Sequence, residues 1–140
     1  MNREILFRGK RTDNGKWVEG FWAILPTDSG EPEYTIIEPV DDDICLWHRP
    51  PVDPATVGQY TGLKDRNGKR IFEGDIIKAR QAFCGELLCR GVVEYRNLRW
   101  EVPEDDFVVE ESSLIEYEVI GNIYDNPELL NSEGTTRNGG

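Results

Sequence analysis

The sequence predicts an all-β protein, with an SH3-like barrel in the C-terminal half and an N-terminal β-hairpin subdomain before it. Three observations support this class. Short runs rich in β-branched and aromatic residues recur along the chain, and turn residues separate them at intervals of about 8–12 residues. No long stretch has the apolar periodicity of a helix. We expect an N-terminal subdomain at 1–52, the barrel at 53–130 and a flexible tail at 131–140.

The stretch 59–78 organises the predicted barrel, because it holds two candidate turns between strand-like runs. Asn67 and Gly68 form the dipeptide that accepts positive φ at both central positions of a type I′ hairpin turn. Gly74 offers a further position for positive φ, and the Asp75 carboxylate can accept hydrogen bonds from nearby backbone amides. The chain is therefore expected to reverse its direction twice in this stretch.

The N-terminal half begins with two predicted strands, at 5–9 and 17–25, joined by a turn of the same Asn-Gly type at 12–15. A polar loop follows the second strand, and the sequence then indicates short strands at 34–37 and 44–47. These elements form the expected N-terminal subdomain.

The strand at 17–25 carries apolar side chains on both faces. Trp17 and Phe21 alternate onto one face, and Trp22 lies on the other. Because both faces require cover, we expect this strand to lie between the two halves of the molecule or against a second chain. Trp17, Phe21 and Trp22 are therefore the candidate residues for self-association.

The segment 49–54 is expected to connect the two subdomains. It contains three prolines, which remove three backbone donors, so it is not expected to pair as a strand on both sides. Asp53 and Pro54 are suited to begin a single helical turn over 55–56.

The second half is expected to contain short strands and one terminal helical turn. The predicted strands lie at 57–61, 75–81, 91–95, 98–102, 107–109 and 117–124. Leu98, Trp100 and Val102 alternate onto one face of the strand that they share, after a turn around 96–97. An apolar helical turn at 127–130 is expected to follow the last strand.

The net charge is −11 at pH 7, and two segments concentrate the acidic residues. Segment 28–53 has one basic residue against eight acidic ones, and segment 101–140 has one against eleven. An acidic chain repels phosphate backbones and anionic lipids, which disfavours nucleic acid and membranes as partners. The sequence has no run of about 20 apolar residues, no signal peptide and only three cysteines, so we expect a cytoplasmic location.

One stretch has the opposite charge. Its basic residues are Lys64, Arg66, Lys69, Arg70, Lys78 and Arg80, with Tyr60 and Phe72 nearby. Such a face can bind nucleic acid through phosphate contacts and base stacking, and Lys64, Arg66, Lys69 and Arg70 are the candidate contacts. The alternative, which we favour, is that these charges protect edge strands and pair with the acidic segments.

Nucleophilic catalysis has one candidate pair, Cys45 with the single histidine, His48. In a strand, an offset of three residues places two side chains on opposite faces, so this pair is disfavoured. A zinc site would need Cys45 and His48 together with Cys84 and Cys89, and free thiols are the simpler interpretation.

Two acidic runs, 41–43 and 104–106, contain the clustered oxygens that Ca²⁺ or Mg²⁺ prefers. Neither run has the glycine and the ligand spacing of an EF-hand loop, and solvated loop charge is the favoured interpretation. We therefore assign no catalytic, cofactor-binding or metal-binding residue.

Three blocks carry a recognisable pattern. They are I-L-F-R-G at 5–9 with G-K-W-V at 15–18, G-Q-Y-T-G-L-K-D-R-N-G-K-R-I-F-E-G-D-I-I at 58–77, and E-V-I-G-N-I-Y-D-N-P-E-L-L at 118–130. In these blocks the chain resembles the YopX family of bacteriophage and prophage proteins. The resemblance implies a small all-β cytoplasmic protein of a bacterial host, with an SH3-like barrel and a tendency to oligomerise. It implies no reaction and no catalytic residue.

Four functional hypotheses follow, in order of preference. The first is a non-enzymatic interaction protein that forms homo-oligomers and binds a host or phage protein. The second is an acidic mimic of nucleic acid that occupies a host DNA- or RNA-binding protein. The third is weak nucleic-acid binding through the stretch from Lys64 to Arg80. An enzyme ranks last, because no acid, base and nucleophile can be brought together from the sequence.

Overall fold

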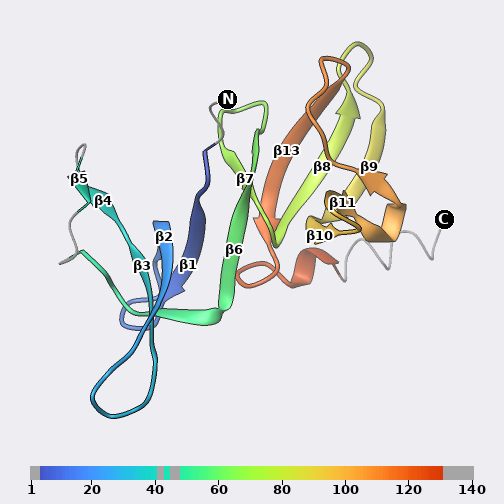
Figure 1. The fold of residues 1–140 in the computed structure, drawn as a ribbon. Coiled ribbons are helices and arrows are strands. Elements are labelled where there is room, and N and C mark those ends of the chain that lie inside the picture. The colour runs from blue at the N-terminus through green and yellow to red at the C-terminus, as the bar shows by residue number, and fades with distance from the viewer. Residues whose placement is uncertain (1–3, 41–42, 45–47, 131–140) are drawn as a thin grey trace. The chain divides into compact units, whose positions relative to one another are not determined.

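Strands make up most of the fold (Figure 1). In the computed structural model, residues 4–40, 43–44 and 48–130 are described. The strands of this part form four sheets, and their pairings are antiparallel, which confirms the all-β class. None of these sheets closes into a barrel among the described residues, so the SH3-like barrel is not confirmed.

The chain divides into two compact units, Met1–Tyr60 and Thr61–Gly140. Unit 1 contains β1 (Phe7–Arg11), β2 (Trp17–Leu25), β3 (Glu33–Ile37), β4 (Pro39–Val40) and β5 (Asp43–Ile44). β6 (Val52–Lys64) runs from unit 1 into unit 2. The predicted domain limit after residue 52 falls at the start of this strand, and the predicted tail at 131–140 lies outside the described residues.

Unit 2 continues with further short strands and a 3-10 helix. These are β7 (Arg70–Phe72), β8 (Asp75–Gln81), β9 (Leu87–Val92), β10 (Glu94–Arg96), β11 (Arg99–Val102), η1 (Pro103–Asp105), β12 (Phe107–Val108) and β13 (Ile115–Asn122). The strand orders in its three-stranded sheets are β13-β8-β9 and β10-β11-β12. A helical conformation begins at Glu128, within the predicted helical turn at 127–130.

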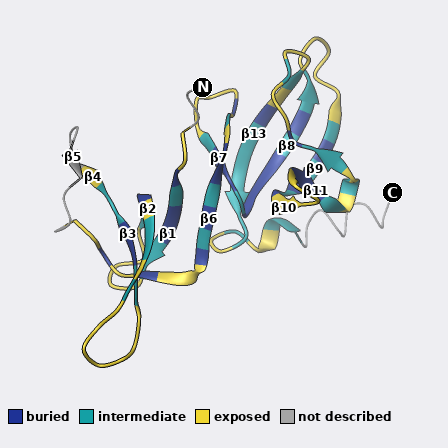
Figure 2. Cartoon of the chain, viewed as in Figure 1, coloured by how far each residue is buried: buried dark blue, intermediate teal, exposed yellow. Residues whose placement is uncertain are grey.

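Unit 1 is built on a sheet in which β2 lies between β1 and β3, and β6 pairs with the other side of β1. Its core consists of Val18, Ile36 and Val52, with partly buried apolar side chains around them. In the first part of β2, buried residues alternate with exposed ones, and Figure 2 shows buried and exposed positions on the strands of this unit. This alternation is the physical basis of the two faces of β2.

β6 corrects the prediction for the segment 49–54. The strand begins at Val52 and includes Pro54, so the helical turn at 55–56 is not present. Val52 and Asp53 pair with β1, so the segment is part of a strand and not only a connection. The pairing with β1 is irregular between Asp53 and Gly58, as in a bulge. Pro54 lies in this irregular part, where its lack of an N–H group removes no hydrogen bond between the two strands. Polar groups complete the bulge: Asp53 Oδ1 accepts the Ala55 N–H at 3.0 Å, and Thr56 Oγ1 accepts the Lys10 N–H at 2.9 Å.

The turns differ in type from the prediction. Among the described non-glycine residues, positive φ is confined to Asn97, Leu98 and Asp106, so Asn67 does not enter the left-handed region. Gly68 alone does so at its turn, with φ of +83°, and its N–H donates to the Asp65 C=O at 3.0 Å. The turn is therefore a type I turn followed by a left-handed glycine, rather than type I′. The glycine at 15 also has positive φ, while its neighbour at 14 does not.

A type I′ geometry occurs instead between β10 and β11. Arg96 pairs with Arg99, and the two residues between them, Asn97 and Leu98, have φ of +56° and +65°. β11 begins at Arg99 and Leu98 is 89% exposed in the turn, so the prediction that Leu98 shares a strand face with Trp100 and Val102 is wrong for this residue. Because Arg96 pairs with Arg99, the loop consists of Asn97 and Leu98, and Leu98 therefore lies in the turn rather than in the strand.

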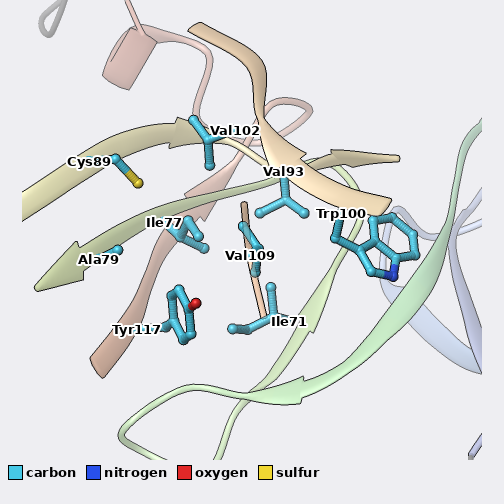
Figure 3. Packing of buried hydrophobic residues seen from close by; sticks show 9 residues of the cluster. All are labelled: Ile71, Ile77, Ala79, Cys89, Val93, Trp100, Val102, Val109 and Tyr117. Carbon is cyan, nitrogen blue, oxygen red and sulfur yellow. The ribbon is translucent and has the colours of Figure 1, made fainter. Parts of the chain in front are cut away.

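The core of unit 2 is formed by side chains from β7, β8, β9, β11 and β13 together with the connections after β9 and β12. Figure 3 shows the cluster, which comprises Ile71, Ile77, Ala79, Cys89, Val93, Trp100, Val102, Val109 and Tyr117. The register explains the set: Ala79 of β8 lies opposite Cys89 of β9 and Tyr117 of β13, so all three point to one face. This face supports the site described next.

Candidate interaction site

The turn between β6 and β7 is held by one buried carboxylate, that of Asp65. Asp65 Oδ1 accepts the N–H groups of Asn67 and Lys69, both at 2.9 Å, which is the local bonding typical of Asp in turns. Asp65 Oδ2 accepts the N–H of Val119 in β13 at 3.0 Å. The same carboxylate therefore shapes the turn and fixes it to a strand far away in the sequence.

A backbone bond completes this attachment. The Arg66 N–H donates to the Tyr117 C=O of β13 at 2.8 Å. Together with the Asp65–Val119 bond, it lets the turn occupy two positions on the β13 edge that is not paired with β8. The basic side chains of the turn are thus carried on a fixed backbone.

The predicted basic residues are placed in two groups. Lys64, Arg66 and Lys69 are exposed around the turn, while Arg70 is only partly exposed at the start of β7. The remaining two, on β8, lie directly opposite glutamates of β13: Lys78 faces Glu118 and Arg80 faces Glu116. Opposite charges in such positions attract each other, so the β8 residues fit the interpretation that basic residues pair with acidic ones.

A groove of about 260 Å³ lies beside the turn. It is lined by Leu63, Lys64, Asp65, Arg66, Glu111, Ser112, Ile115, Glu116 and Tyr117. The turn supplies two cationic side chains, and the segment 111–116 supplies two carboxylates and a hydroxyl. Nothing in the composition of segment 111–116 predicts that it meets the basic turn.

Tyr117 fixes the acidic side of this groove. Its hydroxyl donates to the Glu110 C=O at 2.7 Å and lies 3.1 Å from the Glu110 N–H, which donates to it. Burial raises the pKa of the Tyr117 phenol above its ordinary value of 10.0, against the opposing effect of the hydrogen bond with Glu110. The neutral phenol therefore holds the chain just before Glu111 and Ser112.

The three candidate self-association residues do not form one patch. Trp17 lies beneath the Arg8 guanidinium, whose carbon is 4.7 Å from the ring centroid. Trp22 is on the opposite face of β2, stacked on Tyr34 with ring centroids 6.0 Å apart. Phe21 is 43% exposed and lies opposite Ile37 of β3 on the same face as Trp17. Phe21 is thus the most accessible of the three.

The candidate catalytic and metal groups are dispersed in the described part of the chain. Cys89 is buried in the unit 2 core, whereas Cys84 is exposed and donates to Gln81 Oε1 at 3.2 Å. His48 is exposed, and Cys45 lies outside the described residues. These cysteines therefore do not converge with each other on a zinc site.

The acidic runs show no cation site in the described residues either, where no group of three or more His, Cys, Asp or Glu side chains could hold a metal ion. In the run 104–106, Asp105 Oδ2 accepts the Arg90 N–H at 3.2 Å, and Asp106 ends η1 with φ of +52°. Of the run 41–43, only the backbone of Asp43 is described.

The groove and the turn lie within the part of the chain that matches a known family. The family model of the YopX protein matches residues 6–131, which is most of the sequence. The chain belongs to the YopX family. The family match covers both units, including β2 and the groove.

Two solved structures resemble this YopX-family chain. Protein EF1440 from Enterococcus faecalis is 25% identical, with a TM-score of 0.50 over 92% of this chain and 99% of that chain. Protein yopX from Bacillus subtilis is 20% identical, with a TM-score of 0.50 over 89% of this chain and 96% of its own, and this likeness concerns the fold alone. A comparison with curated proteins finds no match. No helix in the described residues is long and apolar enough to cross a membrane.

Proposed function

We propose that this YopX-family chain is a non-enzymatic interaction protein whose copies associate through the β2–β3 face of unit 1. The proposal includes a phage or prophage origin and a cytoplasmic location in a bacterial host, which rest on the family resemblance and on the composition. It also keeps the SH3-like interpretation of unit 2, supported by the series of short antiparallel strands there.

The observation that carries the proposal is the exposure of Phe21 in the middle of a sheet. β2 is paired on both sides, so this residue is held on a regular, rigid surface. Ile37 lies opposite it on β3, which extends the apolar surface to a second strand. Full burial of a phenylalanine side chain is worth about 1.5–3 kcal/mol, and a second copy placed on this face would gain part of that energy.

Sedimentation of two matched variants tests the proposal. Phe21→Lys places a charge on the proposed interface, whereas Ile24→Lys places the same charge on the opposite face of the same strand, where Ile24 is 58% exposed. We expect the unaltered chain and Ile24→Lys to form oligomers and Phe21→Lys to be monomeric. A monomeric unaltered chain at micromolar concentration, or equal dissociation by both variants, would contradict the proposed interface.

Nucleic-acid binding through the basic turn is the second candidate. The fixed and exposed positions of Lys64, Arg66 and Lys69 favour it. Glu111 and Glu116 line the groove beside these cations and would repel a phosphate backbone, which ranks this function lower. An electrophoretic shift at about 50 mM salt tests it, and a chain that causes no shift there does not use this function.

Imitation of nucleic acid by the acidic surface is a further alternative. Five exposed carboxylates occur between positions 104 and 116 in unit 2; they belong to Glu104, Asp106, Glu110, Glu111 and Glu116. Closely spaced negative charge is what a DNA- or RNA-binding protein recognises in a phosphate backbone. A pull-down from host lysate that returns no such protein would eliminate this alternative.

A further inference from the structure

The groove in unit 2 holds opposite charges on separate elements. The β6–β7 turn contributes Lys64 and Arg66, and the segment leading into β13 contributes Glu111 and Glu116. All four residues are exposed; Lys64, Arg66 and Glu111 present their charges to a ligand, whereas Glu116 also lies opposite Arg80 of β8. A ligand with a single sign of charge meets attraction from one element and repulsion from the other. A ligand that carries both signs at separate points is complementary to both.

Apolar groups lie between the charged ones. Leu63 and Ile115 are partly buried and pack against the core cluster of unit 2, to which the Tyr117 ring belongs (Figure 3). These three residues all line the groove. An aliphatic side chain placed over them would lose contact with water on both sides, which favours a ligand with an apolar group between its two charges.

The edge of β13 continues into the groove. In an antiparallel pair, alternate residues direct their backbone groups toward the partner strand. The Tyr117 C=O and the Val119 N–H bind the β6–β7 turn, so these residues face away from β8. Ile115 lies two residues before Tyr117, so its backbone groups also face away from β8. Its N–H donates to the Ser112 C=O at 3.5 Å. The alternation therefore directs the Ile115 C=O and the Tyr117 N–H to the side on which the groove lies.

We propose that this groove binds a short extended segment of another protein, with an acidic side chain, an apolar side chain and a basic side chain in succession on one face. The backbone of the segment would pair with the β13 edge at Ile115 and Tyr117, as in other cases of strand addition. Its acidic group meets Lys64 and Arg66, and its basic group meets Glu111. The β6–β7 turn already uses the next positions of the same edge, which shows that this edge accepts added backbone.

Titration of the isotope-labelled full chain with capped heptapeptides, followed by amide NMR, tests the proposal. The probes are Thr-Glu-Thr-Val-Thr-Lys-Thr, the same peptide with Glu and Lys exchanged, and a version with Gln at both charged positions. Alternate residues of an extended peptide share a face, so the two charges and the valine point the same way. We expect one of the charged peptides to shift the Tyr117 amide and to bind about tenfold more tightly than the Gln peptide.

Matched variants separate the groove from general charge effects. Arg66→Glu should weaken binding of the charged peptide by about tenfold, whereas Lys69→Glu, on the same turn but outside the groove lining, should change it by less than about twofold. Glu111→Lys and the neighbouring Glu110→Lys provide the same comparison for the acidic side. All four side chains are exposed, so these variants should fold.

Three results would overturn the proposal. They are an unshifted Tyr117 amide with both charged peptides at about 1 mM, equal binding of the Gln peptide, and equal weakening by Lys69→Glu and Arg66→Glu. The peptide readout lies in unit 2, whereas the proposed self-association uses β2 in unit 1. Failure of one proposal therefore leaves the other open to its own test.

Discussion

At the scale of single residues, Asp65 shows how one side chain connects distant parts of the sequence. Each of its two carboxylate oxygens is used: Oδ1 by two N–H groups of its own turn and Oδ2 by Val119. A carboxylate accepts hydrogen bonds but cannot donate them when ionised, so it matches a site that presents only donors. No other side chain of this size offers two acceptor atoms there.

Replacement of Asp65 by Asn should therefore destabilise the fold. The amide keeps one oxygen and places an NH₂ group where the other oxygen was, so at least one N–H donor of the turn or of Val119 would face another donor. We expect a loss of about 1–3 kcal/mol in the free energy of unfolding, measured by urea denaturation. Asp28→Asn, at an exposed loop position, should leave the unfolding midpoint unchanged. Equal stability of the two variants would show that the Asp65 bonds contribute little.

Residue chemistry explains which parts of the central stretch were predictable. Gly74 has φ of +91° and Asp75 Oδ2 accepts the Phe72 N–H at 2.7 Å, as local turn preferences suggest. The bond from Asp65 to Val119 was not predictable in this way, because it joins residues 54 positions apart and depends on how the sheets pack. Local chemistry therefore indicates the turn but not its attachment.

At the scale of elements, the β10–β11 hairpin uses a leucine where glycine is favoured. A type I′ turn requires positive φ at both central residues, and Asn-Gly is the preferred pair. Asn97 fits this preference, but Leu98 has a Cβ that is strained at φ of +65°. With 89% of its surface exposed, the leucine gains little from burial to offset this strain.

Leu98→Gly should stabilise the protein. It relieves a strain of about 1–2 kcal/mol in the folded turn, from which the greater flexibility of glycine in the unfolded chain subtracts about 0.4–1 kcal/mol. We expect a net gain of up to about 1 kcal/mol and a higher melting temperature in calorimetry. Leu114→Gly, which removes another exposed leucine, serves as the control. A destabilising Leu98→Gly would indicate that the leucine makes a contact that outweighs the strain.

Tyr117 gives unit 2 a predicted dependence on alkaline pH. Since burial raises the pKa of this phenol in the folded state above 10.0, the folded chain holds its proton where the unfolded chain has lost it. The stabilisation is complete below about pH 10 and declines as the pH rises through the folded pKa. Tyr117→Phe should lower stability by about 1 kcal/mol at neutral pH and should reduce the decline above pH 10.

Urea midpoints measured across this pH range check the prediction. Tyr95→Phe, at an exposed position, should show the same decline above pH 10 as the unaltered chain. An identical pH profile for Tyr117→Phe and the unaltered chain would mean that another group controls the alkaline loss of stability.

The bounds of a strand were predictable where its own residue pattern sets them. They were not predictable where pairing with another strand sets them. β2 and β8 begin and end where alternation and turn residues indicate, at Trp17–Leu25 and Asp75–Gln81. The start of β6 does not follow from the sequence, because three prolines in 49–54 indicate a connection, whereas a bulge against β1 accommodates Pro54. A bulge depends on the partner strand, which a single run of sequence does not identify.

At the scale of the whole molecule, the candidate site joins segments with opposite charges. The basic turn was recognisable because its cations are close in sequence, but the groove also needs Glu111 and Glu116, which lie beside the turn because Asp65 and Arg66 attach it to β13. The acidic character of segment 101–140 was visible, while its position beside the basic turn was not. Composition predicts the charges, and topology decides which charges meet.

The net charge of −11 also bears on the proposed self-association. Two copies with the same net charge repel each other over distances set by the screening length, which is about 30 Å at 0.01 M salt and about 10 Å at 0.1 M. Contact between apolar side chains such as Phe21 changes little over this range. An association driven by the β2–β3 face should therefore strengthen when salt is raised from about 0.01 M to about 0.1 M.

Sedimentation equilibrium at the two salt concentrations measures this effect, with Phe21→Lys as a control that should be monomeric at both. The dissociation constant should fall with added salt, because screening removes repulsion while the apolar contact is retained. Added salt would instead raise the dissociation constant if the copies were held by pairs of opposite charges, since screening weakens attraction between exposed ions. That result would assign the interface to surfaces of opposite charge and exclude the apolar face of β2.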